Sequence, residues 1–314
     1  MTTAVVFAYH DVGVNCLTTV LSHGIKVPLV VTHDDDPSEN IWFGSVMALA
    51  RRSGIPVVAP AEPNTDELAR RVAGLQPDFL FSFYYRNMLK QPLLAAARLG
   101  ALNMHGSLLP KYRGRSPVNW AVINGESETG VTLHYMAGKP DAGDIVDQQA
   151  VPILPDDTAF DVFRKITAAA GTTLDRNLDR LIAGTAPRIV QNPAHASYFG
   201  GRKPEDGRID WSMPASRIHN LVRGVTTPYP GALTTIAGTP ARVLKTLREP
   251  SMRGPCLQPS LFFQNGRCYA QCGDAAVLRI VELELGGRLL EEQGIAGTFG
   301  STPVPLAAIT AEHI

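Results

Sequence analysis

The sequence has few cysteines and no excess of charge of either sign. Its 314 residues include four cysteines, which we expect to be free thiols. Lysine and arginine together number 29, and so do aspartate and glutamate. The chain therefore lacks the basic excess that is typical of proteins that bind phosphate backbones, and we expect no nucleic acid partner.

Long apolar runs and common cofactor motifs are also missing. No apolar stretch approaches the roughly 18 residues of a membrane helix, and residues 2–8 read as a first strand rather than as a signal peptide. We therefore expect a soluble, cytoplasmic protein without membrane insertion. Cys268 and Cys272 are spaced like two metal ligands, but no third ligand cluster lies nearby, so no metal site is predicted. The sequence contains no internal repeat, no P-loop and no Gly-x-Gly-x-x-Gly.

The first half of the chain alternates β-rich runs with helical patterns. Apolar residues make up 45% and charged residues 18%, which indicates a globular protein with room for two domains. Short strands that alternate with helices of about ten residues predict an α/β domain built on a parallel sheet. The expected strands are 4–8, 27–32, 57–58, 79–83 and 101–104, and the expected helices are 14–22, 43–52, 66–75 and 117–123.

The pattern changes along the second half. Two further strands, 129–135 and 144–151, are expected on either side of a loop, and a long helix follows from an N-cap at Thr158 to a stop at Gly184. Residues 187–205 are rich in proline, glycine and polar residues and are interpreted as a linker. Short β runs beyond residue 206 predict a small β-barrel. The expected domains are therefore 1–204 and 205–314.

The stretch from Asn103 to Pro117 is the most informative part of the chain. Side chains alternate along a strand, so Asn103 and His105 share one face, roughly 7 Å apart at about 3.3 Å per residue. An amide can polarise a carbonyl and an imidazole can move a proton, which suits acyl transfer. An Asn-x-His sequence at a strand end is also a common structural arrangement, so these two residues alone leave both interpretations open.

The residues that follow make a resemblance visible. His-Gly-Ser-Leu-Leu-Pro-Lys-Tyr-Arg-Gly-Arg-Ser-Pro at 105–117 is similar to the signature of folate-dependent formyltransferases, and 139–144 also resembles the family pattern. Residues 210–212 and 228–232 resemble the family's C-terminal domain. The resemblance implies a Rossmann-like formyltransferase domain, a small OB-like barrel, and N10-formyltetrahydrofolate as co-substrate, with no metal.

The resemblance also assigns roles to individual residues. It implies that Asn103, His105 and Asp141 are catalytic, with Asp141 orienting the imidazole of His105. It implies folate-binding roles for Asn87, Met88, Leu89, Arg115, Ala137, Gly138, Lys139, Pro140 and Asp141. Lys111 and Arg113 are interpreted as facing solvent or a phosphate group.

The remaining histidines are weaker candidates. His10 and His33 follow the first two expected strands and would lie near the ligand edge of the sheet. His134 alternates within a strand and is interpreted as a sheet residue, and His219 belongs to a helical turn of the second domain.

Three functions within this family compete: formylation of a sugar nucleotide, formylation of methionyl-tRNA, and folate binding or deformylation. In the tRNA enzymes the segment after the second strand is a basic loop that meets RNA. Here residues 32–40 carry three aspartates and a glutamate, which would repel phosphates.

Residues 4–11, 40–46 and 82–86 instead resemble the branch of the family that formylates UDP-4-amino-4-deoxy-L-arabinose in lipid A modification and polymyxin resistance. We therefore expect a UDP-aminosugar as the small-molecule partner, with an oligomer possible. Members of that branch continue into a decarboxylase domain, so the chain is either a stand-alone version or a fragment of a bifunctional protein.

Overall fold

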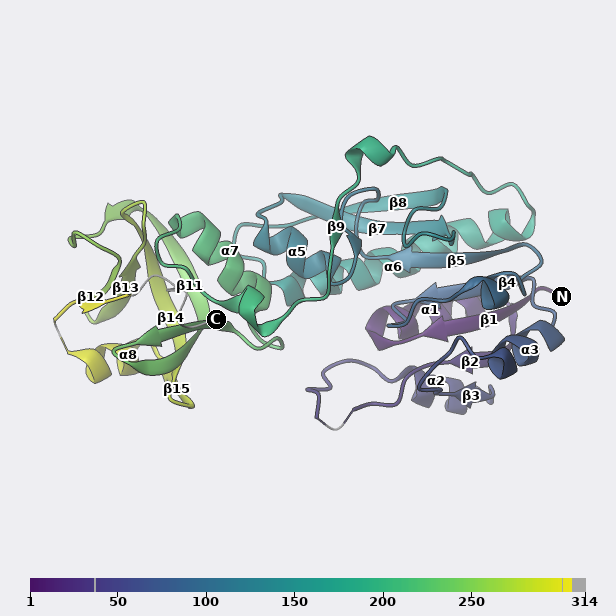
Figure 1. Cartoon of the computed structure of the whole chain (residues 1–314), viewed down its shortest axis with the longest axis horizontal. Coiled ribbons are helices and arrows are strands. Elements are labelled where there is room, and N and C mark those ends of the chain that lie inside the picture. The colour runs from purple at the N-terminus through teal and green to yellow at the C-terminus, as the bar shows by residue number, and fades with distance from the viewer. Residues whose placement is uncertain (37, 301, 307–314) are drawn as a thin grey trace. The chain divides into compact units, whose positions relative to one another are not determined.

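The first part of the chain is built on one mixed β-sheet (Figure 1). The computed structural model describes residues 1–36, 38–300 and 302–306, so the predicted acidic segment at Pro37 and the end of the predicted C-terminal domain lie partly outside the described residues. Within the described residues this sheet has seven strands in the order β3-β2-β1-β4-β5-β7-β8. Its strands are β1 Thr3–Ala8, β2 Lys26–Val31, β3 Val57–Val58, β4 Phe79–Phe83, β5 Gly100–His105, β7 Glu128–Tyr135 and β8 Ile145–Pro152.

Helices connect these strands close to the positions that the sequence predicts. They are α1 His10–Ser22, α2 Val46–Arg52, α3 Asp66–Gly74, α4 Gln91–Leu94, α5 Pro117–Ile123 and α6 Ala159–Ile182. The predicted caps of the long helix are present, because Thr158 and Asp161 bond each other's backbone N–H groups at 3.0 and 3.1 Å and Gly184 adopts a φ of +69°. No helix in the described part of the chain is long and apolar enough to span a membrane.

The sheet departs from the predicted parallel arrangement at one edge. Strands β1 to β5 pair in parallel, whereas β7 pairs antiparallel with β5 and β8 pairs antiparallel with β7. The short connection between β7 and β8 accounts for the second of these pairings, because a parallel pair needs a crossover of a dozen or more residues. The β5–β7 ladder sets Asn103 opposite His134 and His105 opposite Thr132.

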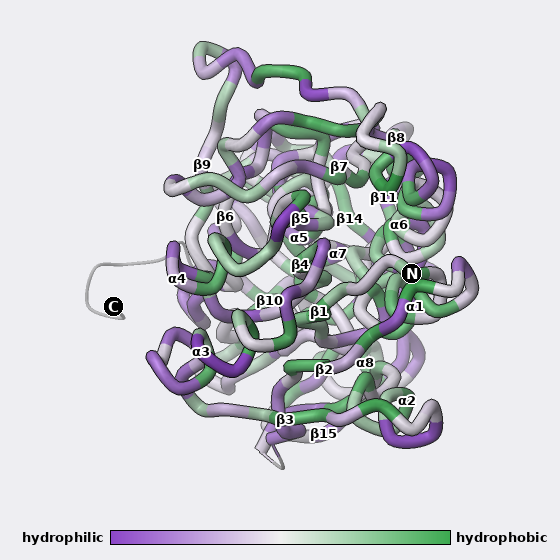
Figure 2. Tube along the Cα trace, turned by 90° about the vertical axis from the view of Figure 1, so that its right-hand side faces the viewer, coloured by the Kyte–Doolittle hydropathy of each residue, from purple (hydrophilic) through white to green (hydrophobic). Residues whose placement is uncertain are grey.

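Alternation along the central strands explains why both faces of this sheet are buried. Val5 and Phe7 of β1 belong to a cluster with Leu68 of α3 and Leu93 of α4 on one face. The intervening residues face α1, whose Gly13 lies so close to Ala8 that a Cβ there would be 3.2 Å away. Strand β2, which is mostly hydrophobic in Figure 2, continues the same pattern. Burial on both faces holds the carboxyl ends of the strands in fixed positions.

The C-terminal part is an antiparallel sheet that packs around one core. Among the described residues its strands follow the order β10-β11-β14-β13-β12-β16, with β15 beside β14. Trp211 is fully buried at the centre of this core, and its indole N–H donates to Thr234 at 2.8 Å. The elements are α7 Ala215–Val225, β10 Ala232–Ile236, β11 Thr239–Arg253, β12 Ser260–Gln264, β13 Arg267–Gln271, β14 Ala276–Leu285, β15 Arg288–Glu291, α8 Glu292–Phe299 and β16 Val304–Pro305.

The two compact units of the chain interleave in sequence. The first comprises residues 1–117, 128–152 and 163–200, and the second comprises 118–127, 153–162 and 201–314. Most of α5 therefore belongs to the second unit, where the Asn119 amide donates to the Gly224 carbonyl at 2.9 Å. A single boundary near residue 204 cannot reproduce this division, because these contacts join residues about a hundred positions apart.

All four cysteines are free thiols, three of them buried. Cys268 lies in β13, and Cys272 follows directly after that strand. Burial raises the pKa of each of these two thiols to about 12, so both remain protonated at neutral pH. Their spacing reflects a buried strand and its end.

Candidate active site

Strand β5 carries Asn103 and His105 on the same face, as the alternation predicts. The antiparallel register sets Asn103 opposite His134 and His105 opposite Thr132 of β7. Residues directly opposite each other share a face, so His134 lies beside Asn103. The Asn103 amide nitrogen is 3.1 Å from Nε2 of His134.

Asp141 reaches these side chains from the loop between β7 and β8. Its Oδ1 lies 3.5 Å from Nδ1 of His105, 3.5 Å from the amide nitrogen of Asn103 and 3.6 Å from Nε2 of His134. Its Oδ2 accepts a 2.9 Å hydrogen bond from the Gly114 backbone N–H. The fold thus brings the three predicted residues together around one carboxylate and adds a second imidazole.

The hydrogen bonds of His105 define which ring nitrogen is free to act as a base. Nε2 lies 2.8 Å from the carbonyl oxygen of Tyr112. A carbonyl can only accept, so Nε2 carries the proton and donates it. The neutral ring then presents the lone pair of Nδ1 to Asp141. A proton taken up at Nδ1 would lie between the ring and the carboxylate and form an ion pair.

Burial and charge act in opposite directions on this pair. Burial lowers the pKa of His105, and the charge of Asp141 raises it only in part, so the ring is neutral at neutral pH. Burial raises the pKa of Asp141, but its interactions with neighbouring polar groups, among them the 2.9 Å hydrogen bond from the Gly114 backbone N–H, outweigh this effect. The pKa of Asp141 therefore lies well below its usual range, and its carboxylate stays charged.

The second imidazole orients the amide of Asn103. Nδ1 of His134 lies 2.9 Å from the Tyr135 carbonyl, which again can only accept, so Nδ1 carries the proton. Nε2 of His134 is then an acceptor and faces the amide nitrogen of Asn103. This chain of hydrogen bonds turns the N–H groups of Asn103 toward His134 and Asp141. The sequence assigned His134 only a structural place in the sheet, and its contact with Asn103 depends on a register that the sequence does not reveal.

The loop after β5 is held by close backbone contacts. Arg113–Gly114 forms the short strand β6, which pairs in parallel with β9, Tyr198–Phe199. Gly114 adopts a φ of +100°, and a Cβ there would lie 2.2 Å from the Phe199 carbonyl oxygen. Only glycine fits this position without displacing β9.

Replacing Gly114 with alanine should therefore reduce kcat on the order of 10²-fold. The replacement displaces the backbone that bonds Asp141, and a displacement near 1 Å in an active site can cost that much. The added methyl group pushes the Gly114 N–H away from Asp141. Steady-state kinetics on the folded variant measure the effect. Gly200→Ala is the matched control, since a Cβ at Gly200 meets nothing within 4 Å. Equal loss in both variants, or none in Gly114→Ala, would contradict this reading.

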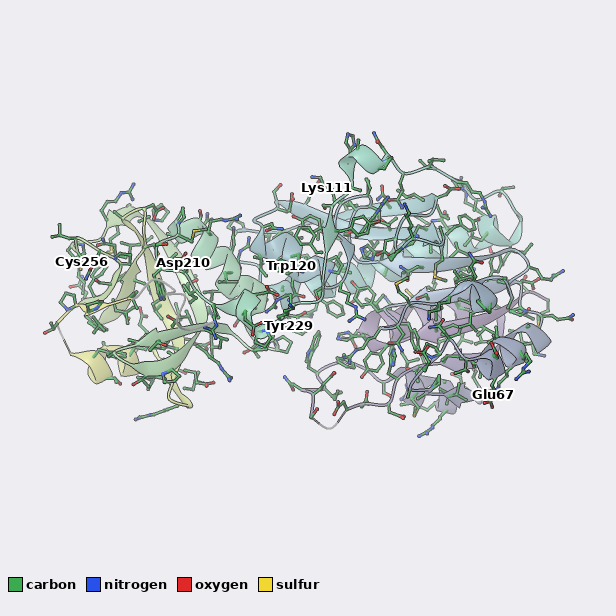
Figure 3. The ribbon with its side chains drawn as sticks, in the orientation of Figure 1. Glu67, Lys111, Trp120, Asp210, Tyr229 and Cys256 are labelled. Atoms are coloured by element: carbon green, nitrogen blue, oxygen red, sulfur yellow. The ribbon has the colours of Figure 1, made fainter. Side chains whose placement is uncertain are left out.

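The basic residues of the loop divide into two groups. Lys111 and Arg115 are exposed, as expected for groups that meet an anion, and Lys111 is labelled in Figure 3. One Arg115 nitrogen donates to the Arg86 carbonyl at 3.2 Å. The prediction for Arg113 is wrong: this side chain is 5% exposed and bonds Gln191 and Tyr198. Its guanidinium is held inward by the buried amide oxygen of Gln191, so it cannot face solvent or a phosphate.

The predicted folate-binding segments lie beside one hydrophobic cluster. Leu89 is buried within the cluster that also contains Tyr85, and Met136 packs against it from the end of β7. Met88 is 57% exposed, and residues 137–140 are exposed loop. Met88 and residues 137–140 are therefore the solvent-facing members of the predicted folate-binding set.

The remaining histidines occupy different surroundings. His10 stacks on Phe43 with ring centroids 3.8 Å apart, and burial lowers the pKa of His10 to about 3. His33 accepts the Arg86 N–H at 3.1 Å, and burial lowers its pKa to about 4. His219 is buried in α7 and lies 2.9 Å from Thr246. In the part of the chain that the structure describes, no three His, Cys, Asp or Glu side chains are grouped to hold a metal ion.

Two protein-family models match the sequence of this chain. Residues 10–178 match the model described as formyl transferase, and residues 202–293 match that of the formyl transferase C-terminal domain. The chain belongs to the formyl transferase family. The first match covers more than half of the chain and includes Asn103, His105 and Asp141.

Solved structures share the fold of this formyl transferase. The N-formyltransferase from Helicobacter canadensis, solved with folinic acid and dTDP-3-aminofucose, is 24% identical with a TM-score of 0.72, over 89% of this chain and 99% of that one. WlaRD, a sugar 3N-formyl transferase solved with dTDP and 5-N-formyl-THF, is 20% identical with a TM-score of 0.67, over 89% and 97%. HypX from Aquifex aeolicus, in complex with tetrahydrofolic acid, is 16% identical with a TM-score of 0.63, over 94% and 47%.

Proposed function

We propose that this formyl transferase moves the formyl group of N10-formyltetrahydrofolate to the 4-amino group of UDP-4-amino-4-deoxy-L-arabinose, in lipid A modification that confers polymyxin resistance. The observation that carries the reaction type is the meeting of Asn103, His105 and Asp141 in one family-matched domain. Similar structures were solved with folates and nucleotide-linked sugars, which supports both substrate classes. We assign the chemistry to residues 1–204 and place the reaction in the cytoplasm.

The co-substrate supplies an activated formyl carbon and a nitrogen leaving group. The sugar amine forms a bond to this carbon, and the bond from the carbon to N10 breaks. In this proposal the Asn103 N–H that makes the long 3.5 Å contact with Asp141 turns to donate to the oxygen on which negative charge develops. Nδ1 of His105 accepts the proton that the amine loses and returns it to the departing N10. Asp141 stabilises the protonated ring in between.

The acidic segment supports a sugar nucleotide over tRNA. Asp34 and Asp36 are exposed, whereas Glu39 binds Arg86 through two contacts of 2.7 Å. Arg86 neutralises only one of these carboxylates, so the surface still repels a polyanion. A single diphosphate needs few cations, and the exposed Lys111 and Arg115 can supply them.

A substrate panel tests this proposal. Purified protein with formyl-folate should formylate UDP-4-amino-4-deoxy-L-arabinose, detected as the product mass, and should leave Met-tRNA unchanged even at low salt. dTDP-3-aminofucose serves as the competing aminosugar nucleotide. Faster formylation of dTDP-3-aminofucose would show that the acceptor is a different sugar, but the acceptor would still be an aminosugar nucleotide. Efficient formylation of Met-tRNA with both sugars inert would overturn the proposal.

A further inference from the structure

The segment that the sequence predicts as a linker is fastened to the catalytic unit. We call residues 189–199 the strap. Figure 1 shows it leaving the end of α6, passing the short helical turn η1 (Pro193–His195) and descending as β9. Ile189 exchanges both backbone hydrogen bonds with Ile145 of β8, at 2.8 and 2.9 Å. At its other end the strap accepts 2.9 Å bonds from the Arg113 and Arg115 N–H groups. It therefore joins the Asp141 side of the sheet to the loop after β5.

Gln191 is the one strap side chain that is almost fully buried among the described residues, at 7% exposure. Its amide nitrogen donates to the carbonyl oxygens of Asp141 and Gly143, at 2.8 and 2.7 Å. Its amide oxygen accepts from Nε and Nη2 of Arg113, at 3.2 and 2.6 Å. Every hydrogen-bonding position of this amide is used, so its orientation is fixed.

Asp141 needs such support because of its backbone. Its φ is +51°, in the left-handed region that carries some backbone strain for any residue with a Cβ, although aspartate adopts it more readily than most. The preceding loop residues 137–140 are exposed, and the Tyr198 hydroxyl contacts the Pro140 carbonyl at 3.5 Å. The two bonds from Gln191 fall on the carbonyls at and just after this residue, where they oppose rotation of the backbone.

We infer that Gln191 is a positioning residue that sets the backbone, and hence the carboxylate, of Asp141 for formyl transfer. The inference rests on the role proposed above for Asp141. Arg113 completes the arrangement, since its Nη1 donates to the Tyr198 hydroxyl at 3.1 Å and its guanidinium lies over that ring. The strap thus acts on the reaction through Asp141 while its own side chains stay away from the reacting atoms.

Gln191→Glu separates positioning from folding. The glutamate keeps the acceptor for Arg113, and the ion pair gained there favours the folded state. It cannot donate to the Asp141 and Gly143 carbonyls, so the loop is released. We expect kcat to fall roughly 10- to 100-fold with little change in KM for either substrate. Asn192→Asp, the exposed neighbour, adds the same charge and keeps the oxygen that caps η1. It should retain normal kcat.

The pH profile distinguishes this role from a merely structural one. The charged or titratable groups that face His105 are Asp141, His134 and Arg113. Asp141 raises the pKa of His105, so its displacement in Gln191→Leu, which adds no charge beside Arg113, should move the acid limb of kcat/KM to lower pH. A variant whose only defect was a smaller folded fraction would have a lower kcat/KM at every pH, and its acid limb would stay at the same pH.

A double variant keeps the two proposals apart. If Gln191 acts through Asp141, Gln191→Glu should cost little more in an Asp141→Asn background. Full activity of Asp141→Asn alone would refute the proposed catalytic role. Loss in Asp141→Asn, together with normal kcat in Gln191→Glu and an unmoved acid limb in Gln191→Leu, would overturn the inference about Gln191 alone. Additive losses in the double variant would also overturn it.

Discussion

His105→Ala should lower kcat by roughly 10²–10⁴-fold while the protein remains folded. The imidazole is the group placed to move the proton of the attacking amine, since Nε2 is committed to the Tyr112 carbonyl and Nδ1 faces Asp141. Alanine leaves no base at this position. Single-turnover measurements with saturating formyl donor separate this chemical step from substrate binding.

The wild-type pH profile adds a test of sign. The base must be neutral, so kcat/KM should rise with pH and level off above the pKa of His105, which burial holds below its ordinary value of about 6.5. Asp141→Asn removes the charge that raises this pKa, so the acid limb should move further down. His23→Ala is the control, because that side chain pairs with Asp175 at the protein surface. Turnover within tenfold of wild type in His105→Ala would show that the base lies elsewhere.

Asn103→Ala should lower kcat on the order of 10²–10³-fold, the usual loss for one oxyanion donor. The Asn103 amide nitrogen lies 3.1 Å from Nε2 of His134 and 3.5 Å from Oδ1 of Asp141, and the longer contact leaves one N–H able to turn to the oxyanion. Asn103→Asp provides a matched variant with the same shape and no N–H donor. It should be at least as slow, because it also adds negative charge beside Asp141.

A specific pattern of results would contradict the role of Asn103. If Asn103→Asp kept near-normal kcat while Asn103→Ala lost activity, side-chain volume rather than hydrogen-bond donation would explain the loss. Circular dichroism and thermal unfolding of both variants show whether the β5–β7 ladder is intact. His134→Gln tests the orientation directly, since it offers an acceptor at a different distance and should cause a smaller loss than Asn103→Ala.

Much of the sheet could be predicted because local pattern decides it. Phe79, Phe81 and Phe83 alternate with neighbours that are also buried, and β4 forms at the predicted residues. The caps at Thr158 and Gly184 are likewise local chemistry. The face shared by Asn103 and His105 follows from the two-residue period of any strand, so their meeting was foreseeable.

The features that the sequence did not reveal depend on long-range pairing. His134 reaches Asn103 only because β7 pairs antiparallel with β5 in one register. Arg113 turns inward because a glutamine about eighty residues later offers it a buried acceptor. Residues 187–205 look like a linker in composition, yet Ile189 pairs with β8 and Tyr198–Phe199 pairs with β6. The composition of a segment indicates that it is exposed to solvent, but it does not identify the distant residues with which its backbone forms hydrogen bonds.

The interleaved units set a limit on how the protein can be shortened. A polypeptide ending at residue 204 would retain every residue of the proposed trio. It would also strip α5 of its neighbours, since Ile123 packs against the C-terminal core and Asn119 bonds Gly224. The apolar face of α5 would then be exposed to solvent and would favour self-association of the truncated protein. A minimal catalyst from this chain therefore calls for redesign of α5 and of the start of α6, because truncation alone would leave an aggregation-prone product.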